Sequence, residues 1–284
     1  MRIGISDGRI WGERHYEMLR SFGFDCYDFN MADTNSLPYT CSRGELEKYL
    51  KNEKKLADEA GITIWQIHGP WRCPPMDSTE EDLAERLEKM KISLGAAAIL
   101  GAKYWVVHPI MPYGLYDVKE GNAQRSREKN LEFMSKLLRA AKQEGVTVCL
   151  ENMPFLDFSI SSPESIADII REIGDKSFAM CLDTGHANVC ADWDSPAQTI
   201  YKYGKYIKVL HVHDNKGRRD DHLAPLFGTV DWQAFSQALR DTSFDGVLSL
   251  ECAPSPKLPK EICEQMYSSY FKIAKAVSEL YAQK

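Results

Sequence analysis

The sequence lacks several features that would assign it to a specialised class of protein. Its 8 cysteines form no Cys-x-x-Cys pair, and Cys149, Cys181 and Cys252 lie within or at the end of apolar segments. This distribution favours reduced, buried cysteines over disulfides or a thiolate metal site. No apolar run reaches the roughly 18 residues of a membrane span, and the first residues lack a signal-peptide core. We therefore expect a cytoplasmic protein without a membrane segment.

A surplus of positive charge is also missing, since the formal net charge is −6. Non-specific nucleic-acid binding needs a basic footprint, so the composition disfavours a nucleic-acid partner but leaves a small basic groove open. No Gly-x-Gly-x-x-Gly follows the first apolar segment, which disfavours a dinucleotide-binding sheet. The candidate basic contacts for a nucleic acid are Lys119, Arg125, Arg127, Lys216, Arg218 and Arg219.

The chain does contain a regular alternation of short apolar segments with long helical ones. Eight such pairs in one chain, with no linker-like or low-complexity segment, predict a single-domain (β/α)₈ barrel over residues 1–284. An open doubly wound sheet is the alternative. The expected strands cover residues 2–7, 24–30, 62–68, 104–108, 146–151, 178–182, 207–213 and 246–251.

Potential metal ligands gather where these strands end, which is where such barrels place their active sites. Five of the 7 histidines occupy these positions, together with carboxylates. Buried carboxylates without partners cost several kcal/mol each, and a bound cation removes that cost. The strand-end residues are His68, His108, Glu151, Asp183, His186, His213, Asp220, His222 and Glu251.

The same positions predict which ion is bound and which histidines are not ligands. Imidazoles and carboxylates without a thiolate suit Mn²⁺, Zn²⁺, Co²⁺ or Mg²⁺. His211 lies two residues before His213, so strand periodicity puts it on the same face but one layer deeper, in a supporting role. His15 is expected on a surface helix.

These motifs resemble the xylose-isomerase-like TIM-barrel superfamily, which includes sugar-phosphate isomerases and epimerases, inosose dehydratases and endonuclease IV. The resemblance covers essentially the whole chain. It is carried by Leu150-Glu151-Asn152, Leu182-Asp183-Thr184-Gly185-His186, His211-Val212-His213-Asp214 and Leu250-Glu251.

The isomerase branch implies one divalent ion held by Glu151, Asp183, His213 and Glu251, with His186 and Arg219 contacting the substrate. Endonuclease IV holds three zinc ions, and the resemblance gives His68, His108, His186, Asp220 and His222 as the additional ligands. The local sequence around Asp220 and His222, followed by Gly228-Thr229-Val230-Asp231-Trp232, resembles isomerase-type members more than the nuclease.

Three functions remain open from the sequence. The first is a metal-dependent sugar or sugar-phosphate isomerase or epimerase, in which Glu151 and Glu251 move protons through a metal-stabilised enediolate. Loss of water after the same proton abstraction would make it an inosose-type dehydratase. The second is an endonuclease IV-like phosphodiesterase acting on abasic-site DNA, and the third is a non-catalytic sugar-binding protein.

Trp71, Trp11 and Trp193 are candidates for stacking on a sugar, or for ordinary loop packing. Substrate identity and oligomeric state are not readable from the sequence.

Overall fold

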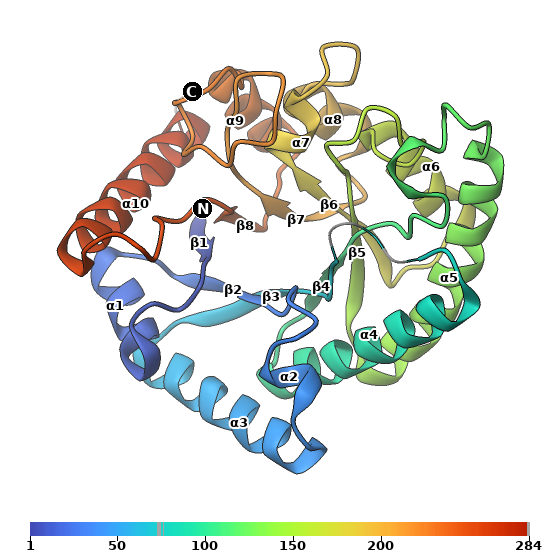
Figure 1. The fold of residues 1–284 in the computed structure, drawn as a ribbon. Coiled ribbons are helices and arrows are strands. Elements are labelled where there is room, and N and C mark those ends of the chain that lie inside the picture. Colours follow the sequence, from blue (N-terminus) through green and yellow to red (C-terminus); the bar gives the residue numbers. More distant parts are fainter. Residues whose placement is uncertain (73–74, 76, 283–284) are drawn as a thin grey trace.

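Eight parallel strands form the centre of the molecule, as the sequence predicts. The computed structural model describes residues 1–72, 75 and 77–282 (Figure 1). The sheet order is β7-β6-β5-β4-β3-β2-β1-β8, and a bridge between Val212 and Leu250 joins the two outer strands into a barrel. The strands are β1 (Arg2–Ser6), β2 (Cys26–Asn30), β3 (Thr63–His68), β4 (Tyr104–Val107), β5 (Thr147–Glu151), β6 (Phe178–Asp183), β7 (Ile207–His211) and β8 (Val247–Leu250).

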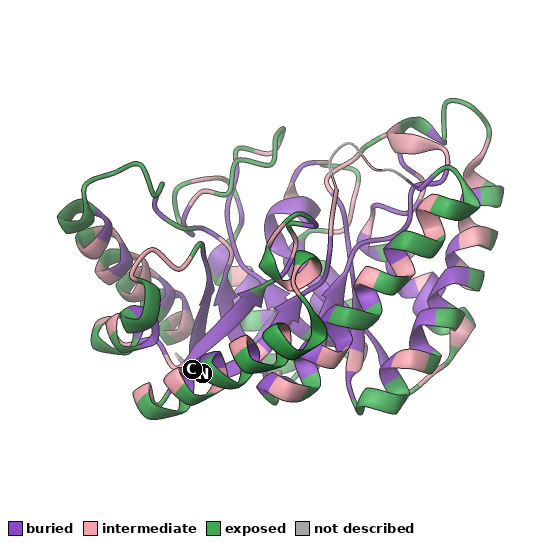
Figure 2. Cartoon of the chain, turned by 60° about the horizontal axis from the view of Figure 1, so that its bottom comes forward, coloured by how far each residue is buried: buried purple, intermediate pink, exposed green. Residues whose placement is uncertain are grey.

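Helices surround the barrel and bury their apolar sides against it (Figure 2). Their ends follow the sequence signals: Ser42 and Thr79 form capping boxes, and Gly61 and Gly101 end helices in the left-handed conformation. The long helices are α1 (His15–Phe22), α3 (Arg43–Ala60), α4 (Glu80–Leu100), α5 (Ala123–Glu144), α6 (Pro163–Ile173), α8 (Pro196–Tyr203), α9 (Trp232–Asp241) and α10 (Lys260–Ala282). Shorter turns are α2 (Leu37–Thr40), α7 (Thr184–Asn188), η1 (Gly12–Arg14) and η2 (Gly114–Tyr116).

The barrel has an apolar core and a polar end. A small buried cluster of Val106, Cys149, Ala179, Cys181 and Val209 packs apart from the large core between strands and helices.

All cysteines of the described part are free, and Cys73 lies outside the described residues. Within the described ranges, no helix has the length and apolar character needed to cross a membrane.

One strand boundary differs from the expectation in a way that affects the site. Strand β7 ends at His211, which pairs with Asp183 of β6, and not at His213. The apolar run continues through Val212, so the sequence alone does not mark the end of the regular strand. His213 therefore lies beyond the regular strand, where the period-two alternation no longer determines which residues it meets.

Candidate metal centre

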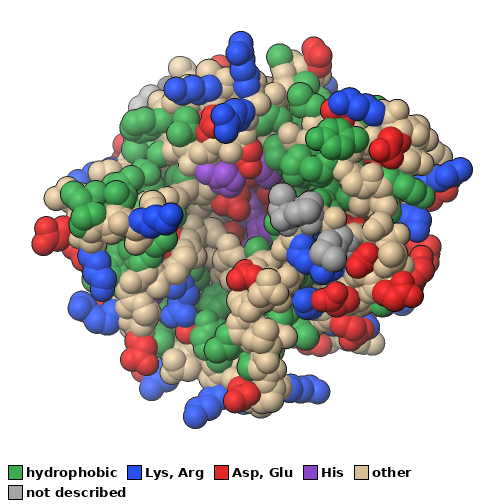
Figure 3. Space-filling model, in the orientation of Figure 1, with side chains coloured by type: hydrophobic (Ala, Val, Ile, Leu, Met, Phe, Trp, Pro, Cys, Tyr) green, Lys and Arg blue, Asp and Glu red, His purple; other side chains and the backbone are tan. Residues whose placement is uncertain are grey.

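Four side chains meet at the C-terminal ends of β5 to β8: Glu151, Asp183, His211 and Glu251, here called the carboxylate group. One possible ligand atom from each lies within 4.8 Å of the others. His211 Nδ1 is 3.0 Å from Glu151 Oε1 and 3.2 Å from Glu251 Oε2. Histidine and acidic side chains lie together at the bottom of a central hollow on this face of the molecule (Figure 3).

The structure places His211 in this group, where the sequence led us to expect His213. His211 does lie deep in the barrel, but its ring still reaches both glutamates because β7 ends at this residue. His213 Nε2 instead lies 3.0 Å from Asp183 Oδ1 and 3.6 Å from Asp220 Oδ1. The deeper layer expected for His211 is thus observed, while its position beside both glutamates makes it, rather than His213, the candidate ligand of this group.

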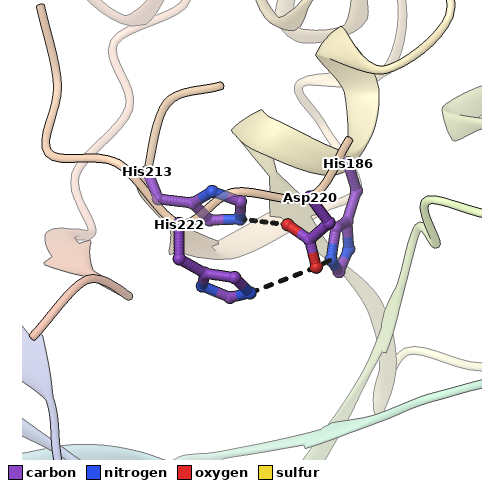
Figure 4. A group of neighbouring side chains, drawn as sticks. All are labelled: His186, His213, Asp220 and His222. Carbon is purple, nitrogen blue, oxygen red and sulfur yellow. Dashed lines mark hydrogen bonds and ion pairs between the residues drawn. The ribbon is translucent and has the colours of Figure 1, made fainter. Parts of the chain in front are cut away.

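His213 belongs to a second cluster, the histidine group, made of His186, His213, Asp220 and His222 (Figure 4). Asp220 Oδ2 lies 3.3 Å from His186 Nε2 and 3.1 Å from His222 Nε2. The rings of His213 and His222 stack with centroids 4.1 Å apart. Three imidazoles and one carboxylate converge here, which is a donor set suited to Zn²⁺ or a similar divalent ion.

His68 and His108 complete the strand-end constellation on the other side of Glu151. His68 Nε2 is 3.1 Å from His108 Nε2, and His108 Nε2 is 3.2 Å from Glu151 Oε2. His68, Glu151 and His211 also form a set whose ligand atoms lie within 4.8 Å of one another. Glu151 is therefore shared between two candidate ligand sets.

A cation fits the carboxylate group because its atoms are incompletely satisfied by the protein. Glu151 Oε2 and Glu251 Oε2 are buried and accept no hydrogen bond from the described residues. Buried carboxylate oxygens without donors are costly, and oxygen and imidazole ligands in this number suit a divalent ion. Nearby, His108 Nδ1 and His213 Nδ1 are also buried without a hydrogen-bond partner in the described part of the chain.

The two glutamates of the carboxylate group differ in their electrostatics. Burial alone would raise the pKa of Glu151, but the charges of His211 and His108 outweigh it and hold that pKa well below the usual value. For Glu251, burial, with repulsion from Glu151 and Asp183, raises the pKa against the opposing attraction of His211 and His222. The Glu251 side chain is also the more accessible, at 19% exposed against 1% for Glu151.

Charge pairing dominates the histidine group. Burial opposes protonation of His186 and His222, but Asp183 and Asp220 raise the pKa of His186 to about 10, and Asp220 with Glu251 raises that of His222 to about 10. Burial lowers the pKa of His108 to about 4 despite the nearby Glu151. A metal ion would displace the protons of His186 and His222, because a metal ligand must be deprotonated.

The segment around Asp183 is built to orient its side chains. Asn152 Nδ2 donates to the Asp183 carbonyl at 3.0 Å, and Asn152 Oδ1 accepts the Asp183 amide at 2.9 Å. The Asn152 carbonyl lies 2.7 Å from His186 Nδ1, which leaves His186 Nε2 facing Asp220. Gly185 is needed beside them, because a Cβ at that position would overlap the His213 ring.

The loop that carries Asp220 and His222 is fixed at its base by a buried carboxylate. Asp214 accepts hydrogen bonds from the amides of Gly228 and Val230 and from the indole of Trp232. This explains the Gly228-Thr229-Val230-Asp231-Trp232 motif, since a side chain at Gly228 would overlap Asp214 Oδ1. His222 itself adopts a φ of 46°, a conformation rare outside glycine that is often found at functional sites.

With this geometry in view, comparison with known proteins identifies the family. The model of the xylose isomerase-like TIM barrel family matches residues 16–268. The chain belongs to the xylose isomerase-like TIM barrel family.

Proteins named for different activities resemble the chain at similar levels of sequence identity. It is 23% identical over 84% of its length to the D-psicose 3-epimerase of Enterocloster bolteae, covering 76% of that protein. It is 26% identical over 74% of its length to a probable endonuclease 4 of Metamycoplasma arthritidis, covering 78% of that protein. A crystal structure of the IOLI protein with a bound zinc atom has a TM-score of 0.74 at 17% identity, with 99% of this chain and 98% of that one covered.

The residues expected to contact a substrate have mixed surroundings. Trp71 lies against His108, with ring centroids 4.5 Å apart, and is partly buried. Arg219 is exposed in the loop that also supplies Asp220. Trp11 instead packs on His15 and Tyr267, with ring centroids 5.5 and 4.7 Å away, so loop packing accounts for it. Trp193 is partly buried between α7 and α8.

Two groups near the site were missed by sequence reasoning. Asp28 of β2 is buried and lies 3.0 Å from His211 Nε2. Its sequence signal is an acidic residue between two aromatic ones in a short strand, which is unusual for a buried segment. Arg86 of α4 is buried in an ion pair with Asp77 and donates to the His108 carbonyl at 3.1 Å. His15, expected on the surface, is fully buried.

Proposed function

We propose that the protein is a divalent-metal-dependent isomerase or epimerase of a sugar or sugar phosphate. The observation that carries this proposal is the pair Glu151 and Glu251, whose carboxylates both approach His211 Nδ1 and each keep one buried oxygen, Oε2, without a hydrogen bond from the described residues. Two carboxylates beside a substrate carbon can remove a proton and return one. The likeness to a D-psicose 3-epimerase supports a carbohydrate substrate.

Glu151, Asp183, His211 and Glu251 would hold the ion. A divalent cation there supplies Lewis-acid stabilisation for the negative charge that develops on a substrate carbonyl oxygen. Glu251 then acts as the base at carbon, because it is the more accessible glutamate and its pKa is raised toward neutrality. Glu151 would return a proton only after taking one up itself, since its low pKa leaves it ionised, and His186, Arg219 and Trp71 would contact the substrate. Loss of water from the same enediolate would give a dehydratase.

Deuterium exchange tests this proposal. The protein, loaded with Mn²⁺, is incubated in deuterated water with ketoses and ketose phosphates, and NMR follows deuterium at carbon and any new epimer or isomer. Glu251→Gln is expected to slow exchange by at least about 100-fold, the usual contribution of a general base. Glu261→Gln, at an exposed position near the start of α10, is the matched control. Exchange by Glu251→Gln at the wild-type rate would refute the base assignment.

A second candidate is a metal-dependent phosphodiesterase of the endonuclease IV type acting on abasic-site DNA. The histidine group favours it, because a one-metal isomerase does not need a second convergent ligand set. Two proposed DNA contacts are engaged elsewhere, since Lys119 pairs with Asp157 and Arg127 with Glu172. Cleavage of abasic-site DNA by the zinc-loaded protein, absent with Asp220→Asn, would favour this candidate over the isomerase.

A further inference from the structure

A layer of buried polar side chains lies directly beneath the carboxylate group. Asp28 of β2 and Gln66 of β3 are 1% and 0% exposed. Asp28 Oδ2 lies 3.0 Å from His211 Nε2 and accepts a hydrogen bond from Gln66 Nε2 at 2.8 Å. Gln66 Nε2 is also 3.4 Å from the carbonyl of Leu210. This layer links β2 and β3 to β7, which lies four strands from β3 in the sheet order.

A local irregularity of the sheet puts Asp28 in this position. The pairing of β2 with β3 shifts between Tyr27 and Asp28, so that Tyr27 lies opposite Ile64 but Asp28 lies opposite Gln66. An uninterrupted register would have placed Asp28 opposite Trp65. Register shifts of this kind re-aim side chains and recur next to active sites. Here the shift places Asp28 opposite Gln66, with which it forms a hydrogen bond inside the barrel.

The contacts orient the His211 ring so that each of its nitrogens faces a different set of carboxylates. Nε2 faces Asp28, and Nδ1 faces Glu151 and Glu251 at 3.0 and 3.2 Å. A carboxylate that accepts the N–H of one imidazole nitrogen leaves the other nitrogen to bind metal and makes it more basic. The contacts of the Asp28 carboxylate with Gln66 and His211 are made through Oδ2, because Oδ1 accepts no hydrogen bond from the described residues.

We propose that Asp28 is the positioning residue for His211, holding Nε2–H so that Nδ1 is presented to a divalent ion in the carboxylate group, and that Gln66 orients Asp28 in turn. This inference rests on the metal-binding part of the proposed function. It does not depend on the substrate or on the reaction type.

The test measures metal binding by the full-length protein, independently of activity. Kd values for Mn²⁺ and Co²⁺ are obtained by calorimetry, and the visible spectrum of the Co²⁺ form reports the ligand field. Asp28→Asn keeps the shape but removes the charge, and we expect about 10- to 100-fold weaker binding with an altered Co²⁺ spectrum. Gln66→Met leaves Asp28 in place and is expected to weaken binding by a smaller factor.

Asp7→Asn is the matched control, because Asp7 is also a buried carboxylate beside a histidine but does not contact the carboxylate group. It should leave the Kd within about two-fold and the Co²⁺ spectrum unchanged. Wild-type Kd and spectrum in both Asp28→Asn and Gln66→Met would overturn the inference while leaving the proposed function standing. A wild-type protein that binds neither ion would overturn both.

Discussion

Two buried clusters at neighbouring strand ends each combine a carboxylate with a histidine, but they are built differently. Asp7 follows β1, and its oxygens accept the Tyr27 and Tyr267 hydroxyls and the Arg9 amide, with His15 Nε2 at 3.0 Å. In the carboxylate group, by contrast, several acidic side chains crowd around His211 and leave buried oxygens without donors.

The difference separates a structural cluster from a candidate metal site. The Asp7 carboxylate is satisfied by the protein itself, and the cluster ties β1 to α1 through His15 and to α10 through Tyr267. In the carboxylate group, Oε2 of Glu151 and Oε2 of Glu251 keep free acceptor capacity that a bound cation would use. Burial of a carboxylate with a histidine is therefore not enough to indicate a metal site; what distinguishes the two clusters is whether the carboxylate oxygens accept hydrogen bonds, since His15 itself has buried ring nitrogens without a partner among the described residues.

The largest contrast is expected when one carboxylate is neutralised in each cluster. Glu151→Gln should reduce metal affinity and proton exchange by at least about 100-fold, because Glu151 is shared by two ligand sets. It should also lower the stability of the metal-free protein, because it removes the attraction of His211 and His108 that holds the pKa of Glu151 low. Asp7→Asn should lower the free energy of unfolding by about 1–3 kcal/mol with metal affinity retained. Calorimetry measures the metal affinity and urea unfolding measures the free energy of unfolding. Loss of metal from both Glu151→Gln and Asp7→Asn would contradict the distinction between the two clusters.

The Asp7 carboxylate also makes the stability of the fold depend on pH, and its pKa shift gives the direction of that dependence. Burial would raise the pKa of Asp7, but His15, Tyr267 and the Arg9 amide together hold it below the usual value. The carboxylate therefore stabilises the fold above the unfolded-state pKa of about 4, and this contribution is lost as the pH falls through the lower folded-state value. Asp7→Asn should flatten this part of the stability profile. A wild-type profile in the variant would contradict the assignment.

A smaller effect, confined to one ligand set, is expected at Gly185. Gly185→Ala places a methyl group where the His213 ring lies, so the ring must move, at a cost of about 1–3 kcal/mol in stability. Metal binding by the histidine group should weaken more than binding by the carboxylate group. Gly95→Ala in α4 is the control, because a Cβ there meets nothing within 4 Å and the helix should become more stable by up to about 1 kcal/mol. Equal effects of the two variants would mean that the packing of Gly185 on His213 is unimportant.

Much of the barrel and its strand ends could be predicted from sequence because both depend on local patterns. Apolar runs, capping residues and glycine stops mark the elements, and every strand-end residue that the sequence singled out lies at this end of the barrel. The position of His211, rather than His213, beside Glu151 and Glu251 could not be predicted, since the apolar run continues past the end of β7. Asp28 and the buried His15 depend on contacts between distant parts of the chain, which no local pattern contains.

The metal content of two single variants tests the central claim most directly. Wild-type protein, His211→Ala and His213→Ala are each equilibrated with Mn²⁺ or Zn²⁺, passed through a desalting column and analysed for ions per chain. We predict that wild type retains at least one ion, that His211→Ala loses the ion of the carboxylate group, and that His213→Ala retains it while losing any ion held by the histidine group. Retention of that ion by His211→Ala and its loss from His213→Ala would contradict the account.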